Sequence, residues 1–105
     1  MSATLSTRDL VAYVLLELRS LVITAETGAN VARRQGCDRT RTWDSEIDQL
    51  VDTASALGAL GRVARLHGDV AAGDEIDAAV INTQHQLIDL GDAARAAALQ
   101  PRRAA

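Results

Sequence analysis

The chain has 105 residues, a net charge of −3 and a pI near 5.2, which leaves room for one domain and argues against general electrostatic binding to nucleic acid or to an anionic membrane. Aromatic residues make up only 2% and Phe is absent, so the core has to be built from Leu, Val, Ile and Ala. These residues suit helix packing better than sheets, and the composition predicts an all-α protein.

The first predicted helix spans residues 7–35. Ser6 is a good N-cap, and Asp9 three residues later completes a variant of the capping box. The end is marked by basic residues in the last turn, followed by Gly36. The residues that recur on one helical face are Val11, Val14, Leu15, Leu18, Val22, Ala25 and Ala29, and we expect this stripe to face the core.

The second predicted helix spans residues 43–67 after a polar loop at residues 37–42. Thr42 is the expected N-cap and Gly68 the expected stop. The core stripe consists of Ile47, Leu50, Val51, Ala54, Leu57, Gly58 and Gly61. Because both glycines lie on this stripe, we expect them to allow another helix close rather than to break this one.

The third predicted helix spans residues 70–99. Asp69 directly after Gly68 indicates a tight helical hairpin, although Gly73 leaves Asp74 as an alternative start. Its core stripe is Ile76, Ala79, Val80, Thr83, Leu87, Leu90 and Ala94. Pro101 ends it, and residues 101–105 are expected to form a disordered tail. The whole chain is thus expected to form one domain, a bundle of three long antiparallel helices.

A second set of aliphatic side chains lies outside these stripes. At about 100° per residue, Leu16 and Ile23 lie roughly 130 to 150° from the centre of their core stripe. The set comprises Leu16, Ile23, Leu60, Val63, Leu66, Ile81 and Ile88, with His85 between the last two. Three helices cannot bury one another on every side, so the pattern predicts that a second subunit completes the bundle through these residues. The alternative is an ordinary surface with scattered aliphatic residues.

Charged clusters offer weaker hypotheses. Arg33, Arg34, Arg39 and Arg41, with Arg19 and Gln84 in one variant, are suited to binding an anion or a nucleic-acid backbone, but they also fit helix-end charge compensation and a solvated loop. Asp44, Asp48 and Asp52 lie on one helical face, which more often is a wet surface than a cation site. We predict no metal and no cofactor, and no catalytic residues are assigned.

Two family resemblances concern architecture. Residues 57–80 resemble a tetratricopeptide repeat in Leu60-Gly61, Gly68-Asp69 and Gly73, but depart from it at Asp77 and Val80. A single unit cannot stack as such repeats do, so this resemblance implies a helical hairpin only. In outline the chain is also similar to the helical chorismate mutases, whose arginine spacing it does not share.

These observations favour a non-enzymatic helical interaction or assembly protein, acting as a homodimer or as a subunit of a larger complex. The alternatives are a small helical enzyme or ligand-binding bundle with an Arg-lined anion site, and a regulator that contacts nucleic acid or its machinery through residues 33–41. Residues 1–7 lack the features of a signal peptide and no apolar run reaches about 18 residues. We therefore expect a cytoplasmic protein without membrane contact.

Overall fold

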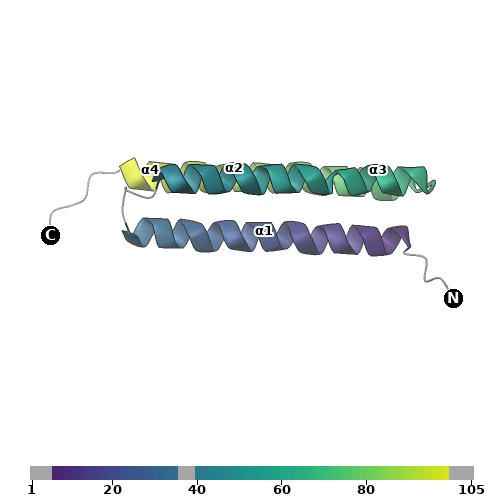
Figure 1. Ribbon diagram of the computed structural model, residues 1–105, viewed down its shortest axis with the longest axis horizontal. Helices are drawn as coiled ribbons and strands as arrows, with labels where there is room; N and C mark the ends of the chain where they lie inside the picture. Colours follow the sequence, from purple (N-terminus) through teal and green to yellow (C-terminus); the bar gives the residue numbers. More distant parts are fainter. Residues whose placement is uncertain (1–5, 36–39, 100–105) are drawn as a thin grey trace.

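The computed structural model describes residues 6–35 and 40–99, with side chains for residues 6–31 and 45–96. These residues form α1 (Thr7–Gln35), α2 (Thr40–Leu57), α3 (Ala59–Leu66) and α4 (Val70–Leu99), and they contain no strand. Figure 1 shows α2 and α3 end to end, so that the molecule consists of three rods, with α1 and α4 running in one direction and α2 and α3 in the other. The bundle is elongated, 65 × 24 × 18 Å. None of the described helices has both the length and the apolar character needed to cross a membrane.

The start of α1 has the expected reciprocal cap. The Asp9 amide donates to the Ser6 hydroxyl at 3.1 Å, and the Ser6 amide donates to the Asp9 carboxylate at 3.2 Å. Two of the amides left without partners at a helix start are thereby satisfied, which explains why the helix begins here.

The predicted single helix over residues 43–67 is instead two helices. It begins earlier, at Thr40 rather than after Thr42, and it is interrupted at Gly58. There the Gly58 amide donates to Ser55 and the Gly61 amide donates to Gly58, both at 3.0 Å, so that the chain tightens locally to the i to i+3 pattern of a 3₁₀ turn. Leu60, predicted to face outward, packs against the core, and Val63 is half-buried.

The connection between α3 and α4 is a tight turn around Gly68. Its φ of +83° is the left-handed conformation that glycine adopts most easily, and the Asp69 amide donates back to the Ala64 carbonyl at 3.0 Å. Asp69 then caps α4 by accepting the Ala72 amide at 3.0 Å. The helix therefore begins at Val70, not at the alternative start Asp74, and Gly73 lies buried inside it. The predicted tail at residues 101–105 lies outside the described residues.

The core follows the predicted stripes, except that Ala64 and Ala72 are buried outside them and that α1 departs from its stripe. Its buried apolar members are Val11, Val14, Leu18, Ala25, Ala29, Ile47, Ala54, Ala64, Ala72, Ile76, Val80, Leu87 and Ala94. Leu15 was predicted to belong to this core but is exposed, and Val22 is only half-buried. Both side chains lie on the edge of α1 that faces α4, where the two rods leave a groove.

Candidate functional site

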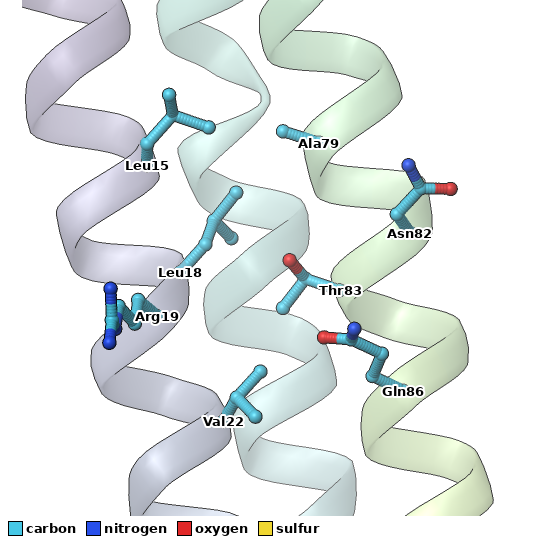
Figure 2. Close-up of a pocket in the computed structure, with 8 residues that line it drawn as sticks. All are labelled: Leu15, Leu18, Arg19, Val22, Ala79, Asn82, Thr83 and Gln86. Atoms are coloured by element: carbon cyan, nitrogen blue, oxygen red, sulfur yellow. The ribbon is translucent and has the colours of Figure 1, made fainter.

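An open groove runs along the seam between α1 and α4. Its volume is about 290 Å³, and its lining residues are Leu15, Leu18, Arg19, Val22, Ala79, Asn82, Thr83 and Gln86. In Figure 2, Leu15, Leu18 and Val22 point from α1 toward α4, Thr83 points back from α4, and Asn82 lies on the outer rim. The floor of the groove is thus mainly aliphatic and its rim is polar.

A second hollow continues this groove toward the far end of α4. It measures about 300 Å³ and is lined by Val22, Glu26, Gln86, Asp89 and Leu90. Val22 and Gln86 line both hollows, so together they form one seam. The two halves differ in charge, because the first contains Arg19 and the second contains Glu26 and Asp89. All three side chains are exposed, and none has a hydrogen bond or ion pair with another described residue.

Two of the predicted interface residues lie on the outer side of α1, beyond the rim of this groove and outside its lining. Leu16 is 67% exposed and Ile23 is 52% exposed. They are one heptad apart and lie next in sequence to the groove residues Leu15 and Val22. At about 100° per residue, Arg19 lies between the groove residues and this outer pair, and we call the side of α1 that holds the groove residues, Arg19 and the outer pair the α1 face.

Ile81 and Ile88 lie on a different edge of the molecule. They are 52% and 45% exposed, and each follows by four residues a side chain directed at α2 or α3. Asp77 pairs with Arg65 of α3 at 2.6 Å, and the Gln84 amide donates to the Val51 carbonyl of α2 at 3.4 Å. Since i and i+4 share a helix face, this pair borders the seam between α4 and α2–α3. A single partner helix therefore cannot cover both the Leu16–Ile23 pair of α1 and the Ile81–Ile88 pair of α4.

The remaining predicted interface residues are also dispersed. His85 is exposed on α4, and Leu66, which is 86% exposed, lies at the end of α3 beside the hairpin turn. Leu60 and Val63 are partly buried within the bundle. None of the predicted interface residues lines a described groove, and Leu16 and Ile23 lie next in sequence to residues that do.

The predicted anion site is not assembled in the described part of the chain. Arg39 and the side chains of Arg33, Arg34 and Arg41 lie outside the described residues. Gln84, proposed as a neighbour of Arg19, is directed toward α2, whereas Arg19 lies on the rim between α1 and α4. In the row of carboxylates, Asp48 and Asp52 are exposed and the side chain of Asp44 lies outside the described residues. No group of three His, Cys, Asp or Glu side chains placed to hold a metal occurs among residues with described side chains.

Polar contacts that the sequence did not reveal tie the hairpin end of the bundle together. The Thr7 hydroxyl donates to Asp69, and Arg8 pairs with Glu75 at 2.7 Å, so both contacts join the start of α1 to the start of α4. The hydrogen bond from Thr7 lowers the pKa of Asp69, with further contributions from the Ala72 amide and the charge of Arg8. No local signal identifies such pairs, because their members are more than sixty residues apart in the chain.

The groove itself was also missed by sequence reasoning. Leu15 and Val22 fit the core stripe of α1, and only the spacing between α1 and α4 leaves them at an open seam. Comparison of the chain with protein-family models, with curated proteins and with solved structures found no match. Its function therefore has to be inferred from the groove and from the α1 face.

Proposed function

We propose that this chain is a non-enzymatic interaction or assembly protein that docks an α-helix of a partner, either a second copy or another protein, on the α1 face. The observation that carries the proposal is that Leu16 and Ile23 are exposed on the same helix that lines an open groove of aliphatic floor, with Arg19 between them and that floor. Exposed apolar surface rimmed by polar groups is typical of binding surfaces on soluble proteins.

The shape of the face supports a helical partner. An amphipathic helix buries side chains at i, i+3, i+4 and i+7 in a groove of this kind, and Leu16 and Ile23 are spaced by seven residues. The polar rim of Arg19, Asn82 and Gln86 offers hydrogen-bonding groups that fix the orientation of such a helix. The catalytic alternative lacks comparable support, because the groove does not pair a nucleophile with a base.

Site-specific photo-crosslinking tests this function in the cells that produce the chain. A photoreactive residue in place of Leu16 or Ile23 should form covalent products with protein, whether a second copy or another chain. The matched control is a photoreactive residue at Asp48, which is equally helical and exposed but lies on α2. Equal yields at all three positions would show that the α1 face has no partner.

A further inference from the structure

We infer that the partner on the α1 face is a second copy of this chain, with the two α1 helices side by side and antiparallel about a two-fold axis near Val22. This inference rests on the proposed function and specifies its partner. It comes from the order of apolar and charged residues along the exposed side of α1.

The exposed side of α1 has the spacing of a helix-pairing seam. Its members follow one another at alternating intervals of four and three residues, and all of them are exposed: Ala12, Leu16, Arg19, Ile23, Glu26 and Asn30. This is the heptad interval that lets two helices keep contact over several turns. The small side chain of Ala12 leaves space for close approach at one end, and Asn30 closes the other end with a polar group. The seam is about 27 Å long at 1.5 Å per residue.

The charges in this seam are arranged to complement themselves. Arg19 and Glu26 are equally distant from the point between Val22 and Ile23. A two-fold axis at that point places Arg19 of each copy opposite Glu26 of the other. Asp89 lines the same hollow as Glu26, so the incoming guanidinium meets two carboxylates. None of these three groups has an ion pair or hydrogen bond within the described residues of one copy, and an antiparallel pair provides a partner for each.

A parallel pair of α1 helices, or a pair formed through the edge with Ile81 and Ile88, provides fewer partners for Arg19, Glu26 and Asp89. In a parallel pair, Arg19 meets Arg19 and Glu26 meets Glu26, which is repulsive. The edge with Ile81 and Ile88 has less need of a partner, because Asp77 already pairs with Arg65 and Asp92 lies 3.6 Å from Arg95. Arg19, Glu26 and Asp89 thus lie together along the open groove between α1 and α4.

Charge reversal tests the antiparallel pairing. Sedimentation equilibrium at loading concentrations from ~5 to ~500 μM covers the range in which interfaces of modest size associate and dissociate. In this range the wild-type chain should form a dimer. Arg19→Glu or Glu26→Arg should each weaken association at least about tenfold, because each creates two symmetry-related like-charge contacts. The double variant Arg19→Glu/Glu26→Arg should dimerise again. An equimolar mixture of the two single variants should form a heterodimer.

Other results would overturn the inference. A wild-type chain that stays monomeric over the whole range excludes the second copy. Single variants that associate like the wild type exclude this pairing of charges. The matched control is Ile81→Ser/Ile88→Ser, which should not change the dimer, whereas Leu16→Ser/Ile23→Ser should abolish it. Circular dichroism of every variant verifies that the helices are intact.

The crosslinking experiment separates failure of this inference from failure of the proposed function. Products at Leu16 that contain only another protein, with a monomeric chain in the centrifuge, would leave helix docking standing and exclude the second copy. If the yield of crosslinked products at Leu16 does not exceed the yield at the Asp48 control, both the second copy and helix docking on the α1 face are contradicted.

Discussion

Gly61 of α3 and Gly73 of α4 face each other where the two helices of the hairpin come closest. A Cβ at Gly73 would lie 2.9 Å from the Gly61 carbonyl oxygen and 2.6 Å from Arg65 Cγ, and a Cβ at Gly61 would lie 3.3 Å from the Gly73 carbonyl oxygen. Neither backbone can yield without moving its helix. The pair therefore sets the distance between α3 and α4, and Arg65 lies over it while binding Asp74 and Asp77.

Gly73→Ala is expected to destabilise the chain. Alanine gains about 1 kcal/mol in helix propensity over glycine, but overpacking against a backbone atom costs about 1 to 3 kcal/mol. We expect a net loss of up to about 2 kcal/mol in the free energy of unfolding, measured by urea denaturation followed by helical circular dichroism. Gly91→Ala is the control, since the nearest atoms to its Cβ would belong to the Ile47 side chain, at 3.3 Å, and not to a backbone. The close approach would be disproved if both variants were equally stable.

The stability of the bundle should fall at acid pH in part through Asp69. Because the pKa of Asp69 is lower in the folded chain than its ordinary value of 3.8, the unfolded chain takes up the proton at higher pH. The contribution of this group is therefore complete above pH 3.8 and is lost as the pH falls through the folded value. Unfolding curves recorded between neutral and acid pH measure this dependence.

Asp69→Asn isolates that contribution. The amide oxygen can still accept the Ala72 amide, but an NH2 group replaces the second carboxylate oxygen, which accepts the Thr7 hydroxyl, and the side chain no longer titrates. We expect lower stability than the wild type at neutral pH and a shallower loss toward acid pH. Asp48→Asn, at an exposed carboxylate of α2 without a described bond, should keep the wild-type slope. An unchanged slope in Asp69→Asn would show that another group carries the dependence.

Thr83→Val should raise stability slightly. Thr83 is only 7% exposed and points into the groove, and its hydroxyl has no hydrogen-bond partner among the described residues. Replacing a buried hydroxyl that has no partner by a methyl group removes a desolvation cost, so we expect a gain of about 1 kcal/mol. Thermal unfolding of the two proteins at equal concentration provides the comparison. A loss of stability would mean that the hydroxyl has a partner that the fold alone does not show.

Leu16→Ser/Ile23→Ser is expected to leave the free energy of unfolding of the dissociated chain within about 0.5 kcal/mol of the wild type, because exposed side chains contribute little to folding. The same holds for Ile81→Ser/Ile88→Ser, whose side chains are similarly exposed. Denaturation at a protein concentration low enough for the dimer to dissociate measures the free energy of unfolding of both variants. A large loss in either variant would show that these residues serve the fold rather than a partner.

The sequence by itself determined the all-helical fold, the bounds of α1 and α4, and most of the side of each helix that is buried. A run of apolar residues at helical spacing has few other ways to be buried, and local groups such as Ser6, Gly68 and Asp69 mark where helices begin and end. These are interactions between residues close in the chain, which is why they can be predicted from it.

Only the tertiary structure decided which edges of the helices meet and which stay open. The packing of α3 within the bundle buries Leu60 in part, while the spacing of α1 and α4 leaves Leu15 at an open groove. The tertiary structure also places Leu16 and Ile23 on a different edge of the molecule from Ile81 and Ile88. The periodicity of one helix cannot contain this information, because the rotation and separation of neighbouring helices depend on side-chain packing between residues far apart in the chain.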